Sequence, residues 1–546
     1  MSYLWLALGI ALLGGLACAG EAGGQRASVW VASPWEHVLK TARPGPAHSI
    51  RLSAARNEYE PARVVIASGG TPLRDVNATA CPLAGPGGRR IAASNIRFYR
   101  EHYINIDKPS SRSTATPGWY PDPLIPFSDP VTGRPITHAQ YRGAPFDVEA
   151  GYSQGIWIDL YVPRSTPAGE YKGAITVTCS GKALARVPLS LTVFDFTLPE
   201  TFAMRSNFGS LENALADRLG MDQASQEFAH VEDLYIDTLL AHRCMPSTLG
   251  RIWPDWSPEK GIDDSGSVRR LRKMVRKRHI NSLMVPFRYW DEPDKCRAYL
   301  RAMEGYLRRE GFLDLSYIYM LDEPNTAEQY ETVRQQGKLI HDVAPGIKRL
   351  CTEQPITQDP SFGDLYGAVD IWCPLWGLYD EKTARERQAL GEEIWSYTAL
   401  CQVDEKNPFW EIDFPPIVYR SPLWVSWHYN LKGLLYWSSI YWKDAATAWE
   451  RPLYGDDEEK CWGEGMLVYP GKPAGIAGPA PSIRLKLIRE AMEDYQYMAL
   501  AEKAAGKEKV DRVVSLLARS FTDWDRNPDA YMGARTKLAN LIQRKG

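Results

Sequence analysis

Residues Leu315 to Pro324 read LSYIYMLDEP, and this stretch indicates the fold of the second half of the chain. Seven residues without a charge come first, and they stop at two adjacent carboxylates, Asp322 and Glu323. An apolar and aromatic run of this length is typical of a strand buried on both faces. Pro324 ends the strand, because proline cannot donate to a strand ladder and holds the preceding residue extended.

The residues that follow predict a helix. Asn325 is a good N-cap residue, and Glu328 follows three positions later, as at many helix starts. The two acids are therefore expected where a buried strand meets the next helix, which in parallel α/β folds is the rim where sites are built. A structural role is the alternative, because acids near a helix N-terminus are favoured by the helix dipole and by solvent.

Strand and helix patterns alternate after Pro199. Besides 315–324, the expected strands are Ala203–Phe208, Cys244–Pro246, Ser282–Phe287, Ile347–Thr352, Val369–Pro374, Glu393–Tyr397 and Gly433–Ser438. Helical patterns cover 226–242, 268–278, 294–309, 326–343, 381–391, 482–504, 510–517 and 535–544. Eight strands interleaved with helices over roughly 300 residues predict a (β/α)8 TIM-type barrel with C-terminal helices. The basic helix 268–278 is interpreted as a solvated outer face rather than a polyanion site.

The first part of the chain differs. Short β-rich runs broken by glycine and proline predict an all-β sandwich: Ile50–Leu52, Arg63–Ser68, Ile96–Tyr99, Gly155–Val162, Ala174–Cys179 and Val187–Val193. Residues 107–147 are expected to form a long loop. We therefore expect a multidomain β plus α/β protein, with a β-sandwich at 28–199, the barrel at 200–505 and a helical extension at 506–546.

The amino-terminal sequence predicts an export signal. Residues 3–17 form an apolar segment that runs into Ala17-Cys18-Ala19, an A-x-A cleavage pattern. We expect a signal peptide at 1–19 and an exported protein, secreted or periplasmic, with no stable membrane insertion after cleavage. Cys18 leaves lipid anchoring open as an alternative.

Charge and cysteine usage exclude several classes of function. The formal net charge is −2, which does not favour binding to nucleic acid. Neither C-x-x-C nor H-E-x-x-H spacing occurs, so we expect no metal site and no cofactor. Cys81 and Cys179 are a candidate disulfide. Nothing in the sequence indicates the oligomeric state.

Aromatic residues are abundant, with 19 Trp and 28 Tyr. On the expected barrel, the carboxyl ends of the strands carry Asn207, Arg288, Asp322, Glu323, Glu353, Trp376, Trp395, Tyr397, Trp437 and Tyr441. Carboxyls for proton transfer together with aromatic faces for a sugar ring are typical of a glycosidase site. Core packing is the alternative for each aromatic residue taken alone.

The adjacency of the two acids limits the mechanism. An ordinary glycosidase sets two carboxyls on opposite sides of the scissile bond, usually from different strands. Neighbours in an extended strand point to opposite faces, so Asp322 and Glu323 fit that arrangement poorly. They fit substrate-assisted catalysis, in which the carbonyl oxygen of a 2-acetamido sugar is the nucleophile. The alternatives are Glu323 with a second carboxylate, Glu353 or Asp413, on a neutral sugar, or a non-catalytic glycan-binding protein.

The chain also resembles the DUF4091 family, whose catalytic portion corresponds to glycoside hydrolase family 123. The motifs that carry the resemblance are RNEYEP (56–61), YMLDEP (319–324), VDIW (369–372), EIWSY (393–397), GLLYW (433–437), LVYPG (467–471), SIRL (482–485) and EDYQY (493–497).

This resemblance implies a β-sandwich, a (β/α)8 barrel and a retaining β-N-acetylgalactosaminidase-like activity on a glycan substrate. It implies that Glu323 is the general acid/base and that Asp322 orients the acetamido group. The residues expected to bind the sugar are Trp376, Trp395, Tyr397, Tyr436 and Trp437, with Asp413 and Glu464 as further polar candidates.

Overall fold

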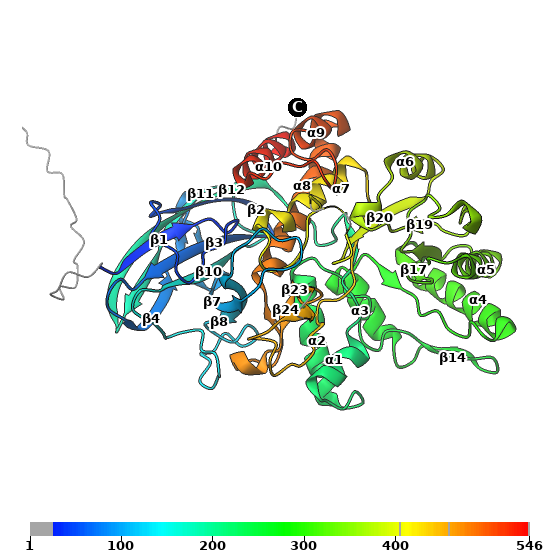
Figure 1. The fold of residues 1–546 in the computed structure, drawn as a ribbon, viewed down its shortest axis with the longest axis horizontal. Helices are drawn as coiled ribbons and strands as arrows, with labels where there is room; N and C mark the ends of the chain where they lie inside the picture. Colours follow the sequence, from blue (N-terminus) through cyan, green and yellow to red (C-terminus); the bar gives the residue numbers. More distant parts are fainter. Residues whose placement is uncertain (1–25, 403, 405, 457–458, 544–546) are drawn as a thin grey trace, which may run out of the picture.

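The computed structural model describes residues 26–402, 404, 406–456 and 459–543 (Figure 1). The expected signal peptide at 1–19, with Cys18, lies outside the described residues. The structure confirms a β-rich N-terminal region that is followed by an α/β region with a parallel sheet. No described helix is long and apolar enough to cross a membrane.

Two sheets form the N-terminal region and share one apolar core, into which β-branched residues such as Val64 and Ile66 project. The first sheet has the order β1 (Ser28–Ala32), β3 (Glu58–Ala67), β10 (Ser153–Val162), β7 (Ile96–Ile106) and β8 (Gly118–Pro126). The second has the order β2 (Ile50–Arg56), β12 (Lys182–Thr197), β11 (Gly169–Cys179), β4 (Leu73–Ala80) and β9 (Phe146–Val148), with β5 (Leu83–Ala84) and β6 (Arg90–Ile91) beside β11.

A third sheet is parallel and curled, and its strands lie within the segments that the sequence predicts, except that β20 ends one residue later, at Thr398. Its order is β13 (Arg205–Asn207), β21 (Gly433–Tyr436), β20 (Glu393–Thr398), β19 (Ile371–Trp372), β18 (Lys348–Cys351), β17 (Ser316–Tyr319) and β16 (Leu283–Met284). Three small antiparallel pairs lie outside it: β14 (Asp255–Ser257) with β15 (Gly261–Asp263), β22 (Leu453–Gly455) with β23 (Lys460–Trp462), and β24 (Val468–Tyr469) with β25 (Ala480–Pro481).

The complete (β/α)8 barrel is not confirmed, because the third sheet has seven strands within the described part of the chain. The expected second strand, Cys244–Pro246, is not a strand. The Phe208 amide does donate to the Met245 carbonyl oxygen at 2.8 Å, beside the end of β13. The Ser247 amide donates to the Gly209 carbonyl oxygen at 3.0 Å, which lies beyond the end of β13, so these two contacts do not form a strand ladder.

Helices surround the curled sheet and close the chain (Figure 1). They are α1 (Glu212–Leu219), α2 (Gln226–Ala241), α3 (Val268–Arg278), α4 (Pro293–Glu310), α5 (Ala327–Val343), α6 (Glu381–Ala389), α7 (Ser421–His428), α8 (Ile483–Ala505), α9 (Lys507–Val514) and α10 (Pro528–Gln543). The basic helix α3 buries Leu271 and Met274 and turns its cations outward, where Arg270 and Arg272 pair with Asp233 and Glu310. The expected solvated outer helix is therefore present.

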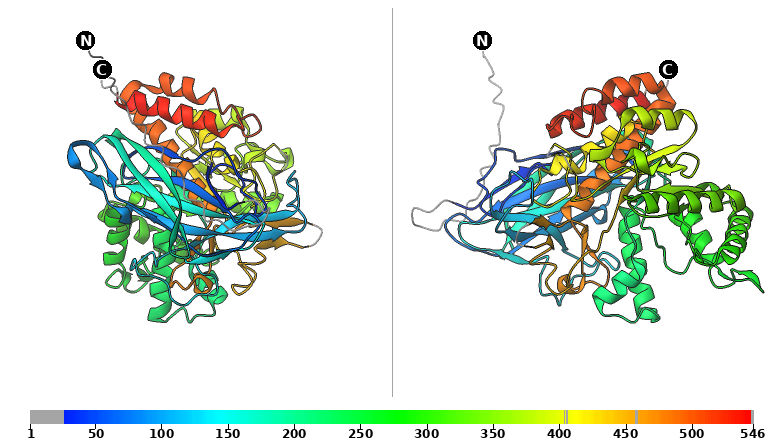
Figure 2. Two further views of the ribbon diagram at one scale, coloured as in Figure 1. Left: turned by 90° about the vertical axis from the view of Figure 1, so that its left-hand side faces the viewer. Right: turned by 45° about the vertical axis from the view of Figure 1, so that its right-hand side comes forward.

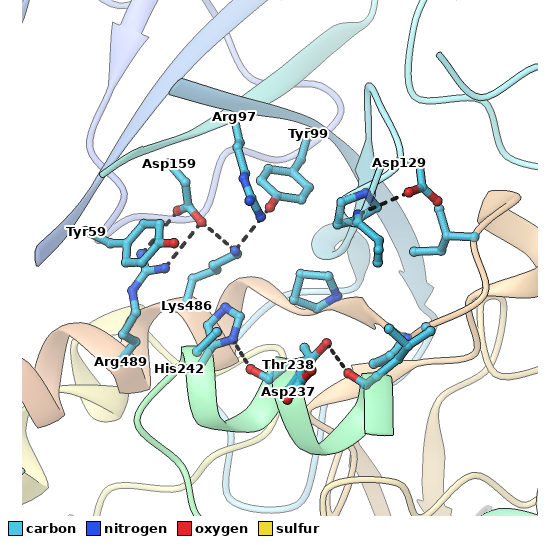
Figure 3. Close-up of a pocket in the computed structure, with 18 residues that line it drawn as sticks. Tyr59, Arg97, Tyr99, Asp129, Asp159, Asp237, Thr238, His242, Lys486 and Arg489 are labelled. Atoms are coloured by element: carbon cyan, nitrogen blue, oxygen red, sulfur yellow. Dashed lines mark hydrogen bonds and ion pairs between the residues drawn. The ribbon is translucent and has the colours of Figure 1, made fainter. Parts of the chain in front are cut away.

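Helix α8 joins the two regions, and α9 and α10 pack beside it (Figure 2). It is buried for most of its length and carries charged side chains into the interface with the sandwich. Figure 3 shows Asp159 of β10 held between Lys486 and Arg489 of α8, beside a pocket of about 250 Å³. A buried carboxylate flanked by two cations fixes the position of α8 against the sandwich.

Two expectations about the first region are wrong. Residues 107–147 are not one long loop, since they contain β8, which pairs with β7. Cys81 and Cys179 form no disulfide: the Cys81 sulfur accepts from the Ala174 amide at 3.2 Å, and the Cys179 thiol donates to the Arg74 carbonyl at 3.2 Å. Pro121, Pro123 and Pro126 hide a strand, because proline is tolerated in a strand at the edge of a sheet, and β8 is the edge strand of this sheet.

Candidate active site

The two acids lie in a bend just beyond β17, with both side chains exposed. The strand ends at Tyr319, although the Met320 amide still donates to the Leu350 carbonyl at 2.9 Å. Pro324 is buried, and helix α5 follows. The N-cap of α5 is Thr326, not the expected Asn325, and its hydroxyl accepts from the Gln329 amide at 3.3 Å.

The backbone at Glu323 is left-handed, with φ of +41°. This conformation is costly for a residue with a Cβ and is often found at functional sites. It also corrects the expectation that neighbouring side chains point to opposite faces, which applies to an extended strand. Asp322 and Glu323 instead line the same pocket.

Thr352, the first residue after β18, connects the two acids. Its hydroxyl donates to Asp322 Oδ1 at 2.8 Å and accepts from the Glu323 amide at 2.9 Å. One buried hydroxyl thereby fixes the Asp322 carboxylate and the bent backbone of Glu323 together. Neighbouring parallel strands supply both sides of this contact, since β17 and β18 pair directly.

Two tyrosines complete the hydrogen bonding of the acids. Tyr319 donates to Asp322 Oδ1, and Tyr397 of β20 donates to Glu323 Oε1. Burial, together with the adjacent carboxylate, raises the pKa of each phenol well above its ordinary value. Both phenols therefore keep their protons across the physiological range and remain hydrogen-bond donors.

The pocket around the acids has a volume of about 510 Å³ and lies at the carboxyl ends of the parallel strands. Its size is within the range of ordinary small-molecule sites. The lining residues are Asn207, Gly209, Ser210, Ser247, Met284, Tyr319, Asp322, Glu323, Thr352, Tyr397, Ala399, Leu400, Cys401, Leu435, Trp437 and Tyr454.

Trp437 dominates one wall of this pocket. It is half-buried, and its ring centroid lies 4.8 Å from that of Tyr441 and 5.7 Å from that of Tyr454. Its indole N–H donates to Glu464 Oε1 at 2.6 Å, which holds the ring in place. Glu464 also accepts from Tyr436, and burial raises the pKa of Glu464 to about 7.

Tyr397 and Trp437 line the pocket, whereas the other expected sugar-binding residues, including Tyr436 and Glu464, lie outside its lining. Trp395 is buried inside the curled sheet, where its ring packs against Tyr317 and directly over Gly433. Trp376 is buried against Trp410 and Phe521. A part in sugar binding remains a prediction for Trp376 and Trp395, and their positions favour a structural role.

Three expected polar residues also lie outside the lining. Asp413 accepts from the amide and the hydroxyl of Ser110 at 2.8 and 2.6 Å, in the interface with the sandwich. Glu353 accepts from Gln358 at 2.8 Å, and burial raises its pKa to about 7. Arg288 is likewise absent from the lining.

Sequence reasoning missed Thr352, Tyr454, Ser247 and Cys401. The sequence could have indicated Thr352, because it is the polar residue at the carboxyl end of the predicted strand 347–352. Tyr454 lies in the short strand β22, and no periodic pattern connects it with the parallel sheet. Within the described ranges, no group of three His, Cys, Asp or Glu side chains is arranged to hold a metal ion.

Two family models match this chain. The glycoside hydrolase 123 N-terminal domain matches residues 37–179, and the glycoside hydrolase 123 catalytic domain matches residues 291–501. A search of curated proteins finds no match.

Among solved structures, the chain is similar to a family 123 glycoside hydrolase from Clostridium perfringens, described in a study of glycolipid glycan hydrolysis. The two are 15% identical, with 95% of this chain and 97% of that chain covered and a TM-score of 0.66. A Bacteroides ovatus GH5 xyloglucanase aligns with 85% of this chain and 100% of that chain, at 8% identity and a TM-score of 0.28. The two domain matches, which follow each other along the chain, show that the chain belongs to glycoside hydrolase family 123 and is a glycoside hydrolase.

Proposed function

We propose that the protein is a retaining glycoside hydrolase that acts on β-linked 2-acetamido sugars by substrate-assisted catalysis. The observation that carries the proposal is that Asp322 and Glu323 are the only acidic residues among the described residues that line the pocket. A mechanism with two opposed carboxyls needs acids separated across the sugar, about 5–9.5 Å apart. Adjacent acids fixed by one threonine suit a reaction in which the substrate supplies the nucleophile.

In the first step Glu323 gives its proton to the glycosidic oxygen as the bond from that oxygen to C1 breaks. The acetamido carbonyl oxygen forms the new bond to C1, which produces a cyclic oxazolinium ion and the free leaving group. Water then attacks C1, Glu323 takes the water proton, and the ring opens to restore the acetamide. Two inversions at C1 give net retention.

The partners of the acids fit these roles. In the proposed mechanism Asp322 accepts from the acetamido N–H, which orients the carbonyl oxygen toward C1 and stabilises the developing positive charge. Tyr319 and Thr352 both donate to Oδ1 of Asp322, so they fix the direction of the carboxylate. Tyr397 holds Glu323 in the same way. Trp437 offers an aromatic face for the sugar ring.

The alternative with a second carboxylate has less support. Glu353 and Asp413 are both buried, bound to other protein groups and outside the pocket lining. Either would need a rearrangement of its hydrogen bonds to reach a substrate beside Glu323.

Leaving-group dependence tests the proposal. Glu323→Gln should lower kcat/KM by several orders of magnitude on 2-acetamido glycosides with alkyl leaving groups, and much less on nitrophenyl glycosides, whose leaving groups need little protonation. Glu328→Gln is the matched control, because this exposed glutamate in the first turn of α5 lies outside the pocket. Near-wild-type turnover of alkyl glycosides by Glu323→Gln would contradict the assignment.

Export is a separate proposal that rests on the apolar segment 3–17 and the A-x-A pattern. The secreted or periplasmic form should begin at Gly20, as measured by intact mass. A mature protein that begins at a lipid-modified Cys18 would favour anchoring instead, and a cytoplasmic protein that retains Met1 would contradict export.

A further inference from the structure

Another pocket lies on the sandwich, at the side where β7, β8 and β10 approach β4 and β9. It has a volume of about 370 Å³ and shares no lining residue with the catalytic pocket. Its lining residues are Lys40, Arg74, Arg100, Glu101, His102, Tyr103, Trp119, Asp147, Val148, Glu149, Tyr152, Ser153 and Gln154.

Trp119 of β8 is unusual for its exposure. Its side chain is 42% exposed, and it is the single tryptophan among the strongly exposed large hydrophobic residues of the described chain. Tryptophan is normally well buried, so an exposed indole ring in a pocket indicates a ligand that covers it. Tyr152 lies close by, since the ammonium group of Lys40 is 5.0 Å from the Trp119 ring centroid and 4.6 Å from that of Tyr152.

The charges of this pocket are only partly balanced. Glu101 forms an ion pair with Arg63, with 2.6 Å between the Glu101 carboxylate and Arg63 Nε. Asp147 forms an ion pair with Arg74, also at 2.6 Å. The remaining acid of the lining is Glu149, which is exposed.

Lys40 and Arg100 form no ion pair with any described residue. Arg100 is half-buried over the ring of Phe146, at 5.6 Å from its centroid, and its buried Nε has no hydrogen-bond partner in the described structure. Burial lowers the pKa of Arg100 to about 10, and no carboxylate offsets that effect. A partly desolvated guanidinium without a counter-charge is unfavourable, which points to an anionic group from outside the chain.

We propose that this pocket is a second carbohydrate-binding site, which takes a sugar bearing a carboxylate or sulfate group. Trp119 and Tyr152 contact the sugar ring, and Lys40 and Arg100 bind the anionic group. A planar guanidinium binds both carboxylate and sulfate groups. We therefore assign a negative charge to the sugar, and the experiment decides which of the two groups carries it. The site is independent of the hydrolytic reaction and would hold a glycan chain on the sandwich while another part of that chain is cleaved.

The test is calorimetric titration in a Glu323→Gln background, so that no ligand is consumed. The probes are a sulfated chondroitin hexasaccharide, the same chain after desulfation, and neutral chitohexaose. Trp119→Ala and Arg100→Gln should each weaken binding of an acidic hexasaccharide by about tenfold or more. Two control variants should bind as the parent does: Tyr366→Ala, which removes an exposed aromatic residue, and Arg51→Gln, which removes an exposed cation of the second sheet.

The three probes separate the possible sources of charge. Equal binding of the desulfated and sulfated chains assigns a carboxylate, and binding of the sulfated chain alone assigns a sulfate. Because chitohexaose can also bind the catalytic pocket, only the part of its binding that is lost in Trp119→Ala counts, and a part as tight as that of the acidic chains would overturn the anionic assignment. Unchanged affinity in both Trp119→Ala and Arg100→Gln would overturn the site itself.

A second measurement separates this proposal from the catalytic one. In the active enzyme, Trp119→Ala and Arg100→Gln should keep their melting temperature and their kcat/KM on a small nitrophenyl glycoside, because neither residue lines the catalytic pocket. An enzyme that cleaves no 2-acetamido glycoside yet loses hexasaccharide binding in these variants would contradict the proposed function and still support the second site.

Discussion

Thr352→Val is the most informative single substitution, because valine keeps the volume of threonine and removes only the hydroxyl. Thr352 is 4% exposed, donates to Asp322 Oδ1 at 2.8 Å and accepts from the Glu323 amide at 2.9 Å. A hydrogen bond to a charged group contributes about 1.5–3 kcal/mol. If that energy orients Asp322 in the transition state, kcat/KM should fall by about 10- to 150-fold.

The backbone of Glu323 adds to the expected effect. A left-handed residue with a side chain costs about 1–3 kcal/mol, and the hydroxyl of Thr352 satisfies its amide. Thr352→Val removes that acceptor, so the bend that presents Glu323 should become less well ordered. A structure of the variant should show Asp322 and Glu323 in more than one conformation.

The assay is kcat/KM on nitrophenyl glycosides with and without the 2-acetamido group. Thr352→Ser is the matched control, because it keeps the hydroxyl and should remain within about threefold of wild type. Thermal unfolding of each variant checks that the fold is intact. A Thr352→Val enzyme with wild-type kcat/KM and an unchanged melting temperature would refute the positioning role of Thr352.

Three further predictions concern the surroundings of the site. Trp437→Ala should raise KM for a 2-acetamido glycoside by about tenfold, with a smaller change in kcat, because the sugar loses an aromatic contact; an unchanged KM would contradict the platform. Burial raises the pKa of Glu464 to about 7, whereas the unfolded chain releases this proton near pH 4.5. The folded protein therefore binds the proton more tightly than the unfolded chain. The free energy of unfolding should fall by about 3 kcal/mol as the pH rises from about 5 to about 8. Glu464→Gln should remove that part of the pH dependence in urea titrations. If the free energy of unfolding depends on pH in the same way in the variant and the wild type, the assignment to Glu464 is wrong. Asp159→Asn should lower the free energy of unfolding by about 3–5 kcal/mol, because Lys486 and Arg489 lose their shared carboxylate; a neutral effect would mean that this cluster does not hold α8.

The position of the two acids could be predicted from the sequence because local rules determine it. A buried apolar run, a proline and a helix start placed Asp322 and Glu323 beyond a parallel strand without tertiary information. The details of the bend could not be predicted in the same way. The left-handed φ of Glu323 and the cap at Thr326 depend on contacts with Thr352 and Gln329.

Aromatic residues show the limit of sequence reasoning most clearly. Trp395 and Trp437 both belong to strands that the sequence predicts for the barrel. Trp395 points into the interior of the sheet, whereas Trp437 lines the pocket. The direction of Trp395 depends on Gly433 of the neighbouring strand, whose missing side chain leaves room for the indole ring. A strand pattern marks both residues as apolar and cannot assign one to the core and the other to the pocket.

The second strand of the expected barrel was misassigned for a similar reason. Cys244-Met245-Pro246 is short and apolar, as a buried strand would be, but only one hydrogen-bonding edge is used near β13. Whether so short a segment becomes a strand is decided by its neighbours rather than by its own residues.

The central claim is that the substrate supplies the nucleophile while Asp322 orients it. It is tested most directly by calorimetric titration with thiazoline mimics of the cyclic intermediate, in both gluco and galacto configurations. One of the two should bind about 100-fold more tightly than the corresponding free 2-acetamido sugar, and Asp322→Asn should remove most of that difference. If neither thiazoline binds more tightly than the free sugar, or if Asp322→Asn binds both as wild type does, the substrate-assisted mechanism is wrong.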